Sequence, residues 1–195
     1  MKSIITIAIV LFLAGCADLP KDNVVPSSVK IAPDLVLAMP QVADLGRPVE
    51  VSQLVTVHYG QQSFAFEVHI QATPEHFLFV GLDLMGRKMI TIDWTKDKIN
   101  YEKASWVPSE LRPENILADI VLLYWPAAIV RQGLATSGGK LLAGKNSRTV
   151  MLRDKKIWRA DYRPTVKNDL WSGKLHYRNL ARGYEFDVQS AETIP

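Results

Sequence analysis

Hydrophobic and polar residues alternate most regularly between residues 64 and 71. The apolar positions are Phe64, Phe66, Val68 and Ile70, and most residues between them are polar. A period of two predicts a β-strand with one buried face and one solvent-facing side. The segment from residue 49 to residue 59 alternates more loosely, and the short link at residues 60–62 predicts a hairpin between the two strands.

The same rhythm of short strands and short turns continues to residue 103. It predicts strands at residues 77–84, 88–94 and 98–103, which pair with their neighbours in an antiparallel sheet. The strand at 77–84 is unusual because Phe77 and Phe79 lie on one face while Leu78 and Val80 lie on the other. It indicates either a central strand in a simple two-layer core or the wall of a sheet that curls around an apolar cavity.

Helical spacing replaces the alternation after Pro108. The apolar positions are Ile116, Leu117, Ile120, Val121, Leu123 and Tyr124, and Pro113 suits the first helical turn. Trp125 and Pro126 predict the end of this helix before a second apolar stretch at residues 127–134. Strands return at residues 148–153, 156–162, 174–178 and 183–189. The order predicts an α+β fold, an antiparallel curled sheet or half-open barrel with a helical lid inserted between two β halves.

The N-terminus has the pattern of an export signal. Lys2 precedes an apolar run of about ten residues, which is too short to span a bilayer. The sequence Leu13-Ala14-Gly15-Cys16 then matches the cleavage motif of bacterial lipoproteins, and Cys16 is the only cysteine in the chain. We therefore expect residues 1–15 to be a lipoprotein signal peptide and Cys16 to carry the lipid.

The remaining chain is expected to form one domain behind a short tether. Residues 16–30 contain several Pro, Ser and Asp residues and are interpreted as a lipidated tether, and residues 31–195 as the single domain. After cleavage the charge is nearly balanced, which argues against a nucleic-acid partner. Ala17 follows the cysteine without the aspartate that retains lipoproteins in the inner membrane, so we expect the outer membrane, facing the periplasm.

Catalytic and metal-binding patterns are absent from the sequence. The four histidines, His58, His69, His76 and His176, lack the spacing of a metal site, so we expect no metal and no cofactor. No serine lies in a nucleophile elbow, so we do not expect an enzyme. Asp83 and Asp93 interrupt apolar strands, and strand ends or outward faces explain them better than burial does.

A stretch between residues 131 and 163 is locally basic. It contains nine Lys and Arg residues and two acidic residues. One interpretation is contact with anionic lipid headgroups or an acidic partner, and the other is the solvated face of two strands. The five tryptophans are typical of core packing, and Trp125, at the helix break, is the best candidate for a cavity rim.

The whole pattern resembles the LolA/LolB group of periplasmic lipoprotein carriers and receptors. More narrowly, residues 111–119, the sequence Leu123-Tyr124-Trp125-Pro126, and the pairs His176-Tyr177 and Gly183-Tyr184 are similar to a lipoprotein family encoded in Gram-negative gene clusters for aryl-polyene and fatty-acid-like products. The resemblance implies an eleven-stranded half-barrel with a helical lid over an apolar cavity that takes acyl chains. It also implies a part in lipid or lipoprotein trafficking.

Two functions are consistent with this sequence. The first is a binding protein that holds a hydrophobic acyl or polyene chain between its sheet and its helices. The second is a structural or adaptor lipoprotein that docks on an envelope protein through its apolar helices, without a ligand. For the first, the candidate cavity and lid residues are Phe64, Phe66, Val68, Phe77, Phe79, Ile116, Ile120, Leu123, Tyr124 and Trp125.

Overall fold

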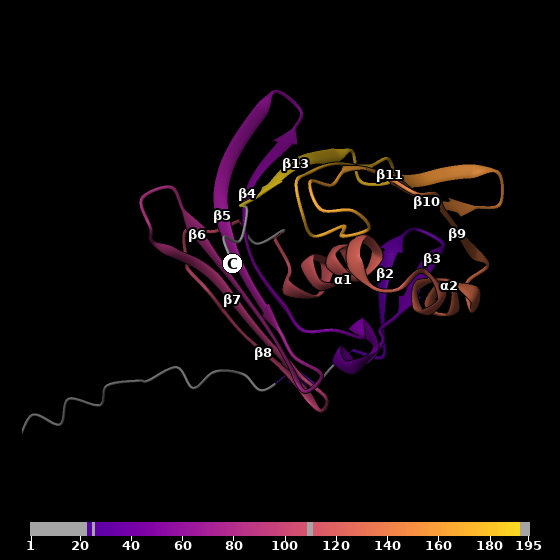
Figure 1. Cartoon of the computed structure of the whole chain (residues 1–195), viewed down its shortest axis with the longest axis horizontal. Coiled ribbons are helices and arrows are strands. Elements are labelled where there is room, and N and C mark those ends of the chain that lie inside the picture. Colours follow the sequence, from indigo (N-terminus) through magenta and orange to yellow (C-terminus); the bar gives the residue numbers. More distant parts are fainter. Residues whose placement is uncertain (1–22, 25, 109–110, 192–195) are drawn as a thin grey trace, which may run out of the picture.

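The computed structural model describes residues 23–24, 26–108 and 111–191 (Figure 1). Eleven strands form one antiparallel sheet that curls without closing. From edge to edge they are β1 (Asn23–Val24), β8 (Lys98–Lys103), β7 (Lys88–Thr95), β6 (His76–Asp83), β5 (Gln62–Ala72), β4 (Val49–Tyr59), β13 (Tyr184–Ser190), β12 (Lys174–Asn179), β11 (Lys155–Arg163), β10 (Ser147–Leu152) and β9 (Gly139–Ala143).

The sheet consists of two walls that meet where β4 pairs with β13. Strands β4 to β8 form one wall, and strands β9 to β13 form the other (Figure 1). The joining ladder extends from Tyr59 opposite Tyr184 to Gln53 opposite Ser190. Because these two strands are far apart in the sequence, their pairing closes the C-terminal half of the chain onto the N-terminal half. The antiparallel α+β architecture predicted from the pattern is therefore confirmed.

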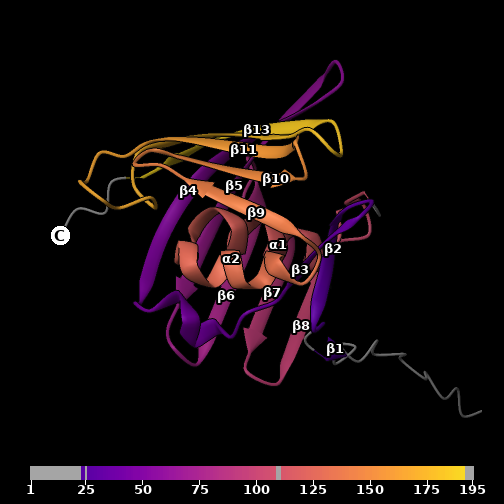
Figure 2. The same cartoon turned by 90° about the vertical axis from the view of Figure 1, so that its right-hand side faces the viewer.

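Two helices fill the concave side of the curled sheet. Helix α1 (Pro113–Tyr124) lies in the angle between the walls, and helix α2 (Ala127–Ala135) continues toward β9 (Figure 2). The side chains of Leu117, Val121 and Leu122 on α1 are fully buried, as are those of Val130 and Leu134 on α2. The predicted helical insertion between two β halves is confirmed, and its break falls at Trp125 and Pro126 as expected.

A separate hairpin covers the other side of the helices. It consists of β2 (Ser28–Ala32) and β3 (Leu35–Ala38), and a short 3-10 helix, η1 (Val42–Leu45), leads from it into β4. Leu35 and Leu37 are fully buried against the helical layer. Residues 16–30 were predicted to form a tether, but β1 pairs with β8, and β2, which begins at Ser28, pairs with β3, so part of that range belongs to strands. The strands were missed because the polar, Pro-containing segments beside β2 are typical of a flexible tether in composition.

The predicted strands match the observed ones closely in the sheet itself. The strands predicted at 49–59 and 98–103 have those bounds, and the others differ by one or two residues. Strand β9 was not predicted, since its five residues follow a Gly-Gly turn and show no alternation. Within the described residues, no helix is both long and apolar enough to cross a membrane. The predicted signal peptide and Cys16 lie outside the described residues.

Candidate ligand-binding site

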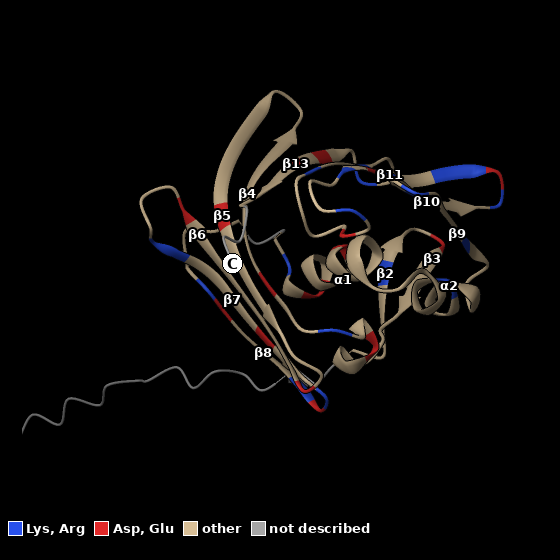
Figure 3. Ribbon diagram, in the orientation of Figure 1, with Lys and Arg blue, Asp and Glu red and all other residues tan. Residues whose placement is uncertain are grey.

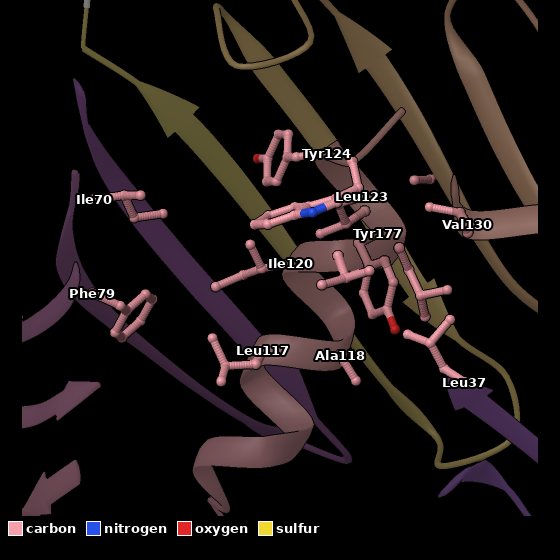
Figure 4. Packing of buried hydrophobic residues seen from close by; sticks show 14 of the residues in the cluster. Leu37, Ile70, Phe79, Leu117, Ala118, Ile120, Leu123, Tyr124, Val130 and Tyr177 are labelled. Atoms are coloured by element: carbon pink, nitrogen blue, oxygen red, sulfur yellow. The ribbon is translucent and has the colours of Figure 1, made fainter. Parts of the chain in front are cut away.

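The ten candidate cavity and lid residues come together on the concave side of the sheet. Strand β5 contributes Phe64, Phe66 and Val68 from its inner face, and β6 contributes Phe77 and Phe79. The remaining five belong to α1 and the residue after it. Figure 4 shows Leu117 and Ile120 of α1 pointing toward Ile70 and Phe79 on the sheet. The ten residues chosen from the sequence therefore lie on the same side of the sheet.

Two of these residues, Phe77 and Trp125, belong to an aromatic cluster with Trp94. The ring centroids of Phe77, Trp94 and Trp125 are 5.7–6.0 Å apart, so the three side chains form one cluster. Trp125 is fully buried, and its Nε1 donates a hydrogen bond to the carbonyl of Gln41 at 3.3 Å. Trp125, the residue predicted for a cavity rim, is enclosed by Phe77 and Trp94 and lines neither of the two hollows described next.

Two hollows on the described surface lie away from this cluster. One has a volume of about 780 Å³ and is bounded by β4, β11, β12 and β13, and the other, of about 320 Å³, lies near the β12–β13 turn. Neither is lined by any of the ten candidate residues. Beneath α1, Leu117 and Val121 have no accessible surface, so neighbouring side chains of the protein enclose them.

One part of the inner face remains open to solvent beside α1. It contains Val57 of β4, Phe64 and Phe66 of β5, and Tyr184 and Phe186 of β13; we call these five residues the aromatic strip. Val57 lies opposite both Phe64 and Phe186, so the strip is continuous across three strands. Phe64 is 42% exposed, and the other four are half-buried. An apolar surface of this kind is available to a hydrophobic ligand.

A carboxylate of α1 connects the helix to the sheet next to the aromatic strip. Tyr177 Oη donates a hydrogen bond to Asp119 Oδ1 at 2.7 Å, and Tyr184 Oη donates to Oδ2 at 2.5 Å. Asn179 Nδ2 donates to both tyrosine oxygens at 3.2 Å. Burial raises the pKa of Asp119, while the two tyrosine hydrogen bonds and the charge of Arg182 oppose that rise.

We call the hydrogen bonds from Tyr177 and Tyr184 to Asp119 the latch. The latch was not predicted from the sequence. A signal was present, since Asp119 is the one acidic residue inside the apolar run from Ile116 to Tyr124. Its partners could not be identified, because they lie on strands about sixty residues later in the chain. The latch holds the middle of α1 against β12 and β13 and so defines one side of the aromatic strip.

The far end of α1 is held by a second polar contact. The ring of Tyr124 stacks on that of Trp171 with centroids 3.8 Å apart, and Gln53 Nε2 donates to Tyr124 Oη at 3.2 Å. Burial raises the pKa of Tyr124 to about 12, so the hydroxyl remains neutral and able to accept this bond. Tyr124 is therefore a structural anchor of the lid at this end.

The polar residues considered for chemistry lie on outward faces or at strand ends. Asp93 faces outward and pairs with His76 at 3.0 Å, and Asp83 ends β6 and pairs with Arg87. His69 is exposed, and its Nδ1 lies 2.8 Å from the hydroxyl of Ser52. Among the residues that the structure describes, no group of three or more His, Cys, Asp or Glu side chains is placed to hold a metal ion.

Comparison with known protein families gives a match over most of the chain. Residues 50–192 match the family described as "Protein of unknown function (DUF3261)". The match covers β4 to β13 and both helices, and therefore includes the aromatic strip and the latch. No curated protein matches the sequence.

Proposed function

We propose that this chain, which belongs to the DUF3261 family, is a lipid-anchored envelope lipoprotein that binds a hydrophobic, acyl-type chain. The aromatic strip is the observation that carries the proposal. Beside the lid helix, the inner face is apolar and partly accessible where the strip lies: Phe64 is 42% exposed, and the other four residues are half-buried. A monomeric protein normally buries such a face.

The strip suits a flexible apolar chain better than a compact polar molecule. Its side chains present ring faces and one branched aliphatic group, and Phe64 and Phe66 stack with centroids 6.1 Å apart. Each methylene removed from water on such a surface contributes about 0.8 kcal/mol. A few methylenes in contact would therefore give measurable affinity, with no need to open the packed core beneath α1.

The alternative, an adaptor that docks on a partner through its apolar helices, receives less support. The apolar side chains of α1 and α2 lie in the protein's own core, including Leu117, Val121 and Leu134. The exposed side chains of α2 are mostly small or polar, such as Ala128, Arg131 and Gln132. Docking through the apolar side of the helices would require the fold to open.

The cellular setting follows from the N-terminal sequence. A lipid on Cys16 would hold the domain at the membrane, and Ala17 favours the periplasmic side of the outer membrane. A curled antiparallel sheet with a helical lid is also what the likeness to the LolA/LolB group implies, so we propose a LolB-like role in lipid or lipoprotein trafficking. The likeness rests on the order of elements and on the short motifs around Tyr124 and Tyr184.

The test is binding of a fluorescent fatty acid to the purified full chain. We expect Phe64→Ser to weaken binding about tenfold, because it removes the most exposed ring of the strip. Val166→Ser is the matched control, since Val166 is an exposed apolar residue in a loop outside the strip. Unchanged binding by Phe64→Ser would reject this site. A wild-type chain that never binds the probe, and that carries a stable partner but no lipid in native mass spectrometry, would support the adaptor.

A further inference from the structure

The outward face of β9 to β12 is predominantly positively charged. The register of these four strands places six cations on it: Lys140, Lys156, Arg159, Arg163, Lys174 and Arg178. We call this set the basic outer face. Asp161 is the only acidic residue of these strands on the same side. Figure 3 shows Lys and Arg also gathered at the β10–β11 end, where Arg153 and Asp154 form the turn and Lys155 begins β11.

Like charges stand directly opposite one another within this face. Arg159 lies opposite Arg178, and Arg163 lies opposite Lys174 in the β11–β12 ladder. Such pairs destabilise a sheet. Only Arg159 has a carboxylate partner, Asp161; the other five cations are exposed and form no ion pair with any described residue. Folding does not explain this arrangement, because opposite charges at the same positions would stabilise the sheet more.

The other wall of the sheet does not share this charge. On β4 to β8, the outward face carries four acidic residues and two lysines, which are Glu50, Glu67, Asp93, Glu102, Lys88 and Lys98. Lys88 and Glu102 form an ion pair at 2.6 Å. The basic outer face is therefore a local feature of one wall and does not follow from the small net charge of the chain.

The hollow of about 780 Å³ lies on the basic outer face. Arg163 and Lys174 line it together with two acids, Asp161 and Asp187. Both acids already have partners within the protein. Asp161 accepts a hydrogen bond from Arg159 Nε at 2.7 Å, and Asp187 Oδ1 lies 2.9 Å from His176 Nδ1. Arg163 and Lys174 therefore remain free to contact an anion that enters the hollow.

Exposed apolar side chains accompany the cations. Leu142, on the edge strand β9, is 58% exposed and lies on the same side as Lys140, two residues away. Leu54 is also exposed and lines the hollow. Cations combined with apolar side chains match the interface of a phospholipid bilayer, where phosphates lie above acyl chains. A soluble polyanion offers no partner for the leucines.

We infer that the basic outer face docks on an anionic phospholipid surface through lipid phosphate groups. The surface lies on the opposite side of the sheet from the aromatic strip, so the two can act independently. Each basic residue near an anionic bilayer increases binding about fivefold, and salt screens the attraction. The cations need no conformational change to make these contacts, because they are already exposed.

The experiment compares vesicles of phosphatidylcholine with vesicles that also contain phosphatidylglycerol. The full chain is captured through a C-terminal tag, and the ratio of the two affinities is measured, because a lipid on Cys16 contributes to both. We expect Arg163→Glu/Lys174→Glu to lower the preference for phosphatidylglycerol at least about tenfold. The control Lys30→Glu/Lys96→Glu makes the same change in net charge at exposed sites elsewhere and should alter the ratio by less than about twofold.

Three outcomes would overturn the inference. The first is a wild type with no preference for phosphatidylglycerol vesicles, and the second is an equal loss of that preference in both double variants. The third is displacement of the vesicles by soluble polyglutamate at matched charge, which would indicate an acidic protein partner. Thermal unfolding and fatty-acid binding of both variants show whether the fold and the aromatic strip are intact. A chain that prefers anionic vesicles without binding fatty acid would reject the proposed function and leave this inference standing.

Discussion

Arg148 donates a hydrogen bond from Nη1 to the backbone carbonyl of Leu122, and the two atoms are 2.9 Å apart. A continuous helix would satisfy that carbonyl with the N–H of residue 126, which is Pro126 and has none. The next carbonyl, that of Leu123, accepts from Tyr162 Oη at 2.7 Å. Two side chains of the sheet thus complete the C-terminal end of α1, where the helix dipole also favours a cation.

We therefore expect Arg148→Met to destabilise the protein by about 1–3 kcal/mol, because a buried carbonyl loses its donor. For a chain of this length, each kcal/mol lowers the melting temperature by about 2–4 °C. Arg163→Met is the control, since Arg163 is exposed and should change stability by less than about 0.5 kcal/mol. Equal melting temperatures for both variants would show that the Leu122 carbonyl needs no capping.

The latch makes the stability of the protein depend on pH in a defined direction. Burial raises the folded-state pKa of Asp119 above the ordinary value of 3.8, so the fold favours its protonated form. The stabilisation linked to that proton is complete in acid and is lost as the pH rises through the folded-state pKa. The side chain in Asp119→Asn remains neutral at every pH, so the contribution of this site to stability does not change over the pH range in which Asp119 titrates in the wild type.

Melting temperatures measured between about pH 4 and pH 8 would test this dependence. We expect the difference between wild type and Asp119→Asn to shift in favour of the variant as the pH rises. Asp34→Asn, at an exposed site, provides the control and should follow the wild type. A constant difference between wild type and Asp119→Asn would mean that the pKa of Asp119 is the same in the folded and unfolded chains.

A tryptophan introduced at two positions would distinguish the packed core from the open strip. Ile120 is 7% exposed and faces the filled interior, so Ile120→Trp should overpack it and cost about 1–3 kcal/mol. Phe64→Trp lies in the open strip and should leave the melting temperature nearly unchanged. If Ile120→Trp were instead tolerated but abolished fatty-acid binding, the ligand would lie beneath α1 and not in the strip.

The contact between α2 and β3 leaves no room for a side chain at Gly133. A Cβ added there would lie 2.7 Å from the carbonyl oxygen of Ala38, which belongs to the backbone and cannot move cheaply. Alanine normally stabilises a helix interior relative to glycine by about 1 kcal/mol. We nevertheless expect Gly133→Ala to lower the free energy of unfolding by about 1–3 kcal/mol, whereas Gln132→Ala, at an exposed neighbour, should be nearly neutral. Denaturant titration of the three proteins would measure both effects.

Membrane anchoring is tested by Cys16→Ser. Without the thiol no lipid can be attached, so we expect an unprocessed or soluble precursor in fractionated cells. Normal membrane retention and processing of that variant would contradict the assignment of Cys16. Recovery of the wild type in the inner membrane would contradict the expected location, while leaving the anchor itself intact.

Local periodicity determined much of this fold. The two-residue alternation around Phe66 and the helical spacing around Ile120 each depend on neighbours in the chain, so the strands of the main hairpins and the broken helix could be located from the pattern alone. The same pattern assigned the candidate residues to one interior. It could not locate β9 or the β2–β3 hairpin, whose short strands carry little periodicity and are stabilised by the layer that they cover.

Tertiary structure decided which parts of that interior are filled and which are open. Trp125 is buried and Phe64 exposed because of how far α1 extends along the sheet, a relation between segments about sixty residues apart. The partners of Asp119, about sixty residues away, and the like-charged pair Arg163 and Lys174, on two neighbouring strands, likewise depend on how the strands pair. Hydrophobic pattern specifies which face of an element is buried, but only the register between elements specifies what lies against it.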